Sequence, residues 1–166
     1  MRRHLSGWPG LILLVTLGAA LPLAVATLFR SALPPELGSL KLMQSASGND
    51  ARSLVDRMHG KDVAQRENFV GLYRGERGSA TVYLTVYPSD RQASEDYTAM
   101  ESRIEKGNTA FERFSRFSVQ GQEGAACVGQ GQVHFFFAHE RSLYWLATDL
   151  PVARETLRRL IESSRE

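Results

Sequence analysis

The residues best suited to chemistry are Cys127 and His134, which flank a turn at Gln130-Gly131. If that turn joins two antiparallel strands through a two-residue loop, the two side chains lie directly opposite each other. A turn shifted by one residue still leaves them diagonal neighbours on one face. A thiol and an imidazole that close could act as a nucleophile and its general base, or as two ligands of a soft metal ion.

The surroundings of the pair favour a structural role. A structural metal site needs about four ligands, and the only other nearby ligand type is His139, whose odd spacing from His134 places it on the opposite face or in a turn. Cys127 lies between Ala126 and Val128, where a cysteine usually behaves as a small buried hydrophobic residue. We therefore predict no catalytic residue and no cofactor, and keep Cys127 and His134 as weak metal-ligand candidates.

Aromatic side chains offer a second kind of site, a surface for a protein partner. We expect the three consecutive phenylalanines at 135–137 to belong to the core, as most aromatic stripes do. Two threonines, Thr81 and Thr85, make the face around Tyr83 half polar, so that face could be open. The candidates for a partner surface are Tyr83, Tyr87, Tyr144 and Trp145.

The composition of the 166-residue chain is that of an ordinary globular protein, with 43% hydrophobic and 23% charged residues. Its single cysteine excludes an internal disulfide, and its length suffices to bury a core without a metal ion. Arginines in 74–77 and 113–116 are interleaved with glutamates, so no dense basic stripe marks a nucleic-acid surface. We therefore expect one compact domain and exclude nucleic acid as a partner.

An uncharged, mostly apolar run from Leu11 to Phe29 is long enough to cross a membrane. Its nineteen residues would form about 28 Å of helix, close to the hydrocarbon thickness of a bilayer. Arg2 and Arg3 precede the run, whereas Arg30 is the only charge that follows it before Glu36. This excess of positive charge on the amino side predicts a single-pass protein of the cytoplasmic membrane, with its N-terminus inside and its remaining residues outside.

The same run could instead be a signal peptide that is removed after export. Arg2 and Arg3 would form its positively charged start, and Ala24-Val25-Ala26 would be the cleavage site. The protein would then be secreted after cleavage near Ala26. Apolar residues continue beyond this site through Phe29, which favours the uncleaved anchor. Both interpretations export residues 31–166.

The chain divides into a cytoplasmic start (1–10), the anchor or signal helix (11–29), a flexible stem (30–48) and an exported α+β domain (49–166). The stem mixes Pro, Gly and Ser with scattered Leu and has no regular period, although Leu37–Met43 could be a strand of the domain. All 18 acidic residues follow the anchor. Residues 31–166 therefore hold 17 basic and 18 acidic residues, a net charge of −1, and the basic excess of the whole chain lies beside the anchor.

Regular patterns begin at Asn49 and continue to the end of the chain. Apolar spacing predicts a helix over 49–60 and a longer helix from the capping box Ser89-x-x-Gln92 to Gly107. A third helix follows Pro151, with an apolar stripe of Ala153, Leu157, Leu160 and Ile161. Strands are predicted over 68–73, 80–87, 113–120, 124–129, 132–138 and 142–149, the last three as a meander. The predicted fold class is α+β, with one antiparallel sheet of about six strands covered by three helices.

Three stretches of the exported domain combine glycine and aromatic residues in a recognisable order. They are Val82-Tyr83-Leu84-x-Val86-Tyr87, then the helix with Ala93, Tyr97 and Met100, then the run from Gly129-Gln130-Gly131-Gln132-Val133-His134-Phe135 to Tyr144-Trp145-Leu146 and its following helix. Over about residues 49–164 this pattern resembles small bacterial exported or envelope proteins of a family of unknown function. The resemblance implies an envelope location and no established activity, so it assigns no functional residue.

An anchor, a stem and a small domain without a catalytic constellation favour a non-enzymatic role. We expect a membrane-anchored accessory protein of the cell envelope whose exported domain binds a partner protein. The alternative is an exported domain that binds a small ligand or a metal ion through Cys127, His134 and adjacent aromatic residues. A thiol enzyme built on the same pair is a third hypothesis.

Overall fold

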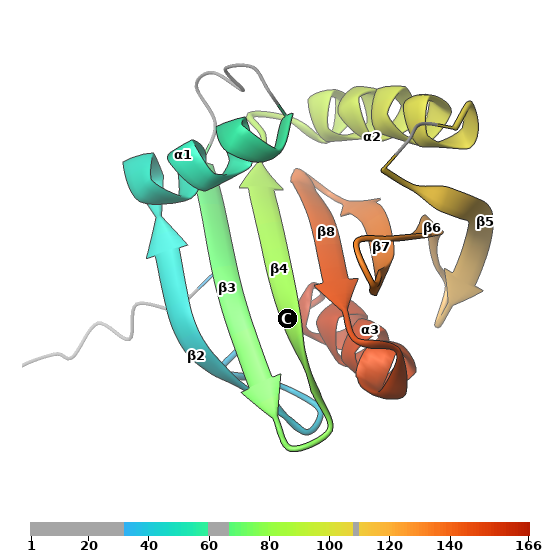
Figure 1. Cartoon of the computed structure of the whole chain (residues 1–166). Coiled ribbons are helices and arrows are strands. Elements are labelled where there is room, and N and C mark those ends of the chain that lie inside the picture. Colours follow the sequence, from blue (N-terminus) through green and yellow to red (C-terminus); the bar gives the residue numbers. More distant parts are fainter. Residues whose placement is uncertain (1–31, 60–66, 108–109) are drawn as a thin grey trace, which may run out of the picture. The chain divides into compact units, whose positions relative to one another are not determined.

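Eight antiparallel strands form one sheet in the order β1-β2-β3-β4-β8-β7-β6-β5 (Figure 1). The computed structural model describes residues 32–59, 67–107 and 110–166. The strands are β1 (Glu36–Leu37), β2 (Leu40–Ser47), β3 (Glu67–Gly75), β4 (Gly78–Val86), β5 (Glu112–Val119), β6 (Gln122–Gly129), β7 (Gln132–His139) and β8 (Ser142–Thr148). The helices are α1 (Gly48–His59), α2 (Asp90–Glu105) and α3 (Ala153–Ser163), the last preceded by a 3-10 turn at Leu150–Val152.

The α+β class, the antiparallel sheet and the three helices are confirmed, whereas the number of strands is eight and not about six. The two additional strands, β1 and β2, lie in the predicted stem, so the flexible stem is corrected over 36–47 and the alternative strand over Leu37–Met43 is right. Leu37 and Leu40 are fully buried. A β-bulge between Leu42 and Gln44 breaks the alternation of the strand, which explains why the sequence shows no regular period there.

The predicted segments 1–10 and 11–29 lie outside the residues that the structure describes. Residues 31–166 form one compact unit, and its first residue also lies outside the described ones. Within the described part of the chain, no helix is both long and apolar enough to cross a membrane.

Two-residue turns fix the register of the meander formed by β5, β6, β7 and β8. Gln120-Gly121 and Gln130-Gly131 both have positive φ at each position, with values of 52° and 77° in the first turn and 52° and 79° in the second. This is the type I′ geometry, whose twist matches that of the flanking strands. The predicted meander of β6, β7 and β8 is therefore confirmed, and β5 extends it by one strand.

A long-range pairing joins the two halves of the sheet, because β8 lies against β4. Its register places Leu146 opposite Val82 and Trp145 opposite Tyr83. The sheet therefore runs without interruption from β1 to β5. Both of its edges, β5 and the part of β2 beyond β1, are strands with a neighbour on one side only within the described residues.

The sheet is covered on both faces, as its two apolar sides require. We call the two faces the α3 face and the α2 face. On the α3 face, Leu157, Leu160 and Ile161 pack on the sheet in the largest buried cluster, together with Leu37, Leu40, Tyr73, Val82, Leu84, Phe137, Tyr144 and Leu146. On the α2 face, α2 covers a cluster with Phe136 and Trp145, while α1 covers a smaller one around Val70. Neither helix fully covers the middle of β2, β3 and β4, where Met43 and Leu72 are exposed.

Candidate functional site

Cys127 and His134 are neighbours as the turn predicted, since their Cα atoms are direct partners in the β6–β7 register. They lie on the α2 face beneath aromatic rings and are almost fully buried, with 1% and 4% of their surface exposed. The ring of Phe111 meets the imidazole edge-on with 4.9 Å between centroids. A substrate could not reach either side chain without displacing this cover.

Both nitrogens of His134 are already hydrogen-bonded. The carbonyl oxygen of Gly129 lies 2.9 Å from Nε2 and can only accept, so Nε2 carries the proton. Nδ1 accepts a hydrogen bond of 3.1 Å from the indole nitrogen of Trp145. The ring is thus held in its neutral form, and burial lowers its pKa below the ordinary value, against a smaller opposing effect of the Gly129 bond. No ring nitrogen remains to activate the Cys127 thiol or to bind a metal ion.

Burial also raises the pKa of the Cys127 thiol, to about 11, so at neutral pH it is a thiol and not a nucleophilic thiolate. Among residues 32–59, 67–107 and 110–166, no group of three or more His, Cys, Asp or Glu side chains could hold a metal ion. The Cys127–His134 pair therefore has the geometry of a packed and hydrogen-bonded core, and it gives no support to the ligand-binding or thiol-enzyme hypotheses.

The structure corrects three of the four aromatic candidates for a partner surface. Tyr87, Tyr144 and Trp145 are 3%, 8% and 8% exposed and belong to the core. The Tyr87 hydroxyl donates to Asp96, Tyr144 stacks on a phenylalanine of the α3 face, and Trp145 stacks on another of the α2 face. The reason is that the sheet is covered on both sides. Only Tyr83 lies near the surface, at the margin of a groove.

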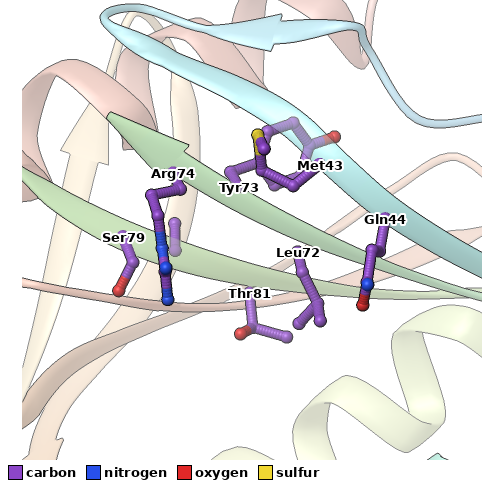
Figure 2. Close-up of a pocket in the computed structure, with 8 residues that line it drawn as sticks. Met43, Gln44, Leu72, Tyr73, Arg74, Ser79 and Thr81 are labelled. Atoms are coloured by element: carbon purple, nitrogen blue, oxygen red, sulfur yellow. The ribbon is translucent and has the colours of Figure 1, made fainter. Parts of the chain in front are cut away.

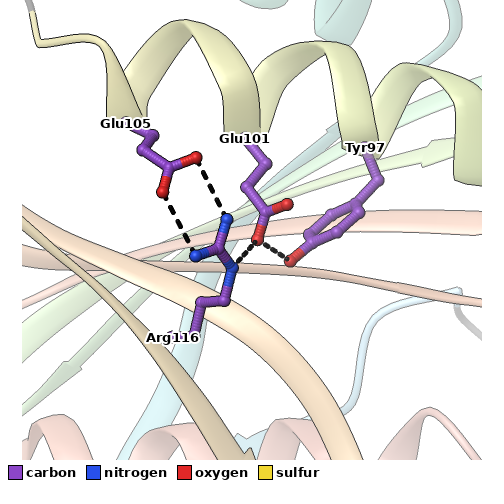
Figure 3. Close-up of polar contacts among 4 residues, drawn as sticks. All are labelled: Tyr97, Glu101, Glu105 and Arg116. Carbon is purple, nitrogen blue, oxygen red and sulfur yellow. Dashed lines mark hydrogen bonds and ion pairs between the residues drawn. The ribbon is translucent and has the colours of Figure 1, made fainter.

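A polar cluster on α2 and β5 fixes one edge of the sheet (Figure 3). Arg116 binds both oxygens of Glu105 at 3.2 and 3.1 Å, while its Nε binds Glu101 at 3.1 Å and the Tyr97 hydroxyl donates to the same Glu101 oxygen. The two carboxylates raise the pKa of the Arg116 guanidinium, which is already charged at any ordinary pH. The sequence does not reveal this bridge, because Arg116 is fifteen residues from Glu101 and eleven from Glu105.

An open groove lies on the α2 face, on the middle of β2, β3 and β4. Four large hydrophobic side chains of the described residues are exposed, and three of them, Met43 (64%), Leu54 (38%) and Leu72 (42%), line this groove. It consists of two adjoining hollows of about 390 and 210 Å³ that share Gln44 and Leu72. Figure 2 shows the larger hollow, in which Leu72 lies between Thr81 and Gln44.

Two cations lie next to each other at one end of the groove. Arg74 lines the larger hollow and is the direct cross-strand partner of Lys41, which is in turn opposite Glu36 on β1. Like charges directly opposite on a sheet are unfavourable, and no ion pair of Arg74 occurs within the described residues. The row continues through Ser79 to Asp149, whose carboxylate accepts hydrogen bonds from Ser79 and Gln132. The two cations of the row, Lys41 and Arg74, lie beside the exposed leucine and methionine.

Sequence reasoning missed this groove for two reasons. Met43 lay in the predicted stem, and its exposure depends on the bulge of β2. Leu72 alternates with other apolar residues on a strand that is apolar on both faces, so no period marks it as exposed. The exposure of Leu72 depends on where α1 lies on the sheet, and that position is known only from the folded structure.

Comparison of the chain with protein-family models, with curated proteins and with solved structures gives no significant match.

Proposed function

We propose that this protein is a non-enzymatic accessory protein of the cell envelope, anchored in the membrane by residues 11–29, whose domain binds a partner protein in the groove on β2, β3 and β4. The resemblance to small bacterial exported proteins supports the envelope location, and the uncharged run supports the anchor. The observation that carries the binding role is the collection of Met43, Leu54 and Leu72 around one groove.

Single exposed apolar residues are common on protein surfaces, but three such residues around one groove indicate a binding site. Full burial of a Met or Leu side chain is worth about 1.5–3 kcal/mol, and these side chains are roughly one-third to two-thirds exposed, so each could contribute about 1 kcal/mol when a partner covers it. The groove is also large enough for one or two side chains. It therefore supports binding of a short segment and not of a broad flat surface.

The chemistry of the groove specifies the segment. Leu72 and Met43 can contact an apolar side chain, and Arg74 can bind a carboxylate, because it forms no ion pair within the described residues. We therefore propose a segment of a partner protein in which an apolar residue is followed or preceded by an acidic one. Gln44 and Thr81, which also line the groove, can hydrogen-bond its backbone.

The test is site-specific photo-cross-linking of the full chain in its own membrane. A photoreactive amino acid replaces Leu72 in the groove, and the control carries the same residue at Leu150, which is apolar and 74% exposed but lies outside the groove. We expect a covalent adduct from position 72 and none from position 150. Mass spectrometry of the adduct should locate the link in a segment with an apolar and an acidic residue.

Charge reversal then tests the proposed contact. Arg74→Glu should lower the yield of the adduct, or the affinity for a synthetic peptide of the captured segment, by about tenfold or more. The matched control is Arg154→Glu, the same change at an exposed position of α3. Equal adducts from positions 72 and 150, or equal effects of the two charge reversals, would show that the groove is not the binding site.

A further inference from the structure

The β2 edge of the sheet is open over a short, uncharged segment. β1 covers only Leu40 and Lys41, and the backbone N–H of Leu42 donates to the carbonyl of Pro35 at 2.9 Å. Met43 is the bulged residue, from Gln44 to Ser47 the strand pairs only with β3 within the described residues, and α1 begins at the next residue. Alternate residues of this segment thus direct their backbone groups away from β3, and none of the five is charged.

The opposite edge is protected in the ways that natural edge strands usually are. β5 carries Glu112, Arg113 and Arg116, and a bulge with Arg113 at a φ of 55° interrupts its pairing with β6. Its far end is tied to the end of α3, because Arg165 donates to the carbonyl of Gln120. The absence of charge on Met43–Ser47 is therefore specific to the β2 edge.

We propose that the β2 edge pairs antiparallel with the β2 edge of a second copy of this chain. The open segment is bounded by β1 at one end and by α1 at the other, and its middle residue is Ser45. A twofold axis at Ser45 places Gln44 opposite Ala46 of the other copy, with the bulged Met43 at the margin of each paired segment. The bounds of the open segment alone determine this register.

Charge does not oppose this arrangement. The twofold axis brings no like charges together in the paired segments, since both are uncharged. Beyond them, β1 of each copy, whose Glu36 is paired with Lys41, meets the start of α1 of the other copy.

The geometry also agrees with a chain that is anchored in a membrane. An antiparallel pair within one sheet has its twofold axis perpendicular to the sheet, so the α2 faces of both copies lie on one side and the α3 faces on the other. The described chain begins on the α3 face, where Leu33 is buried and the Tyr73 hydroxyl donates to the carbonyl of Pro34. Both copies thus begin on the same side of the dimer, and both grooves open on the other.

The test is oxidative cross-linking of the full chain in its membrane through one introduced cysteine. Ser45→Cys places two thiols directly opposite each other at the axis, where cross-strand Cα atoms are about 4.5–5.5 Å apart and a disulfide can form. The control is Ser118→Cys, a change at an exposed serine on the β5 edge. The native Cys127 is buried and does not interfere, which the unmodified chain checks.

We expect Ser45→Cys to form a disulfide-linked dimer at least about tenfold faster than Ser118→Cys. The pairing does not depend on the proposed partner, and it is measured at a different residue, so either proposal can fail alone. Equal rates would overturn it, and so would a disulfide to a different protein. If the thiol of the Ser45→Cys variant neither cross-links nor reacts with maleimide, other residues of the same chain cover the edge, and this result would overturn the proposal as well.

Discussion

His134 shows how the surroundings of a residue decide between catalysis and structure. The spacing predicted its position opposite Cys127, and the structure confirms that position. Both ring nitrogens form hydrogen bonds, one with Trp145 and one with Gly129, and the ring of Phe111 packs edge-on against the imidazole. Because Trp145 and Phe111 come from other strands or loops of the chain, the sequence shows the pair but not what surrounds it.

The neutral, buried state of His134 makes stability depend on pH. In the unfolded chain its pKa is near 6.5, and in the folded chain burial lowers that pKa. Below about pH 6.5 the imidazole binds a proton in the unfolded state but not in the folded state. The contribution of neutral His134 to the free energy of unfolding is therefore fully present above that pH. It decreases as the pH falls, by at most about 1.4 kcal/mol per pH unit. The neighbouring Cys127 does not titrate in this range, because its pKa is about 11.

Thermal unfolding of the full chain in detergent between pH 8 and pH 5.5 measures this effect. The control is His134→Gln, whose amide can donate and accept but does not titrate. We expect the melting temperature of the unmodified chain to fall over this range and that of the variant to change much less. Parallel curves for the two proteins would show that His134 does not carry the pH dependence.

At the scale of elements, local turn chemistry explains what the sequence predicts well. A glycine after Gln120 and after Gln130 marks two-residue turns, and these determine the register of three strands. The capping box of α2 is confirmed, since Ser89 accepts from the backbone of Gln92. The stripe of α3 is buried as predicted.

Pairings between distant strands explain what the sequence does not predict. No local signal indicates that β8 lies against β4, since the two strands are separated by α2 and the three other strands of the meander. β1 has only two residues and β2 is bulged, so neither shows a strand period. The groove lined by Met43 and Leu72 depends on the path of β2, and so it could not be predicted.

A substitution in the turn between β6 and β7 should increase the stability of the protein, and it tests the left-handed conformation of Gln130. Gln130 has a φ of 52°, which costs about 1–2 kcal/mol for an ordinary L-residue and less for asparagine. Because Gln130 is exposed, Gln130→Asn should stabilise the protein by about 0.5–1 kcal/mol, whereas Gln130→Val should destabilise it. Melting temperatures of the two variants decide the point; a rise for Val or a fall for Asn would contradict the left-handed conformation. Gln120 is unsuitable for this test because its side chain also binds Glu162.

At the scale of the whole molecule, charge is distributed by position along the chain. Arg2, Arg3 and Arg30 flank the uncharged run, while residues 31–166 have a net charge of −1. A nearly neutral domain has no general attraction to nucleic acid or to anionic lipid. We therefore expect the location of the protein to depend on residues 1–30, and its specificity to depend on local features such as the groove.

The last prediction concerns the orientation that residues 1–30 impose. If Leu11–Phe29 remains as an anchor, the intact mass of the mature protein includes residue 1, and protease added outside spheroplasts digests the domain. Replacing both Arg2 and Arg3 by Glu removes the positive charges that hold the start of the chain inside, so a smaller share of the domain should be accessible to the protease. The matched control is Arg141→Glu with Arg154→Glu, the same charge change at two exposed positions outside residues 1–30. A mature chain that starts after Ala26 would show instead that the run is a signal peptide, and the two copies of the proposed dimer would then have to associate without a shared membrane.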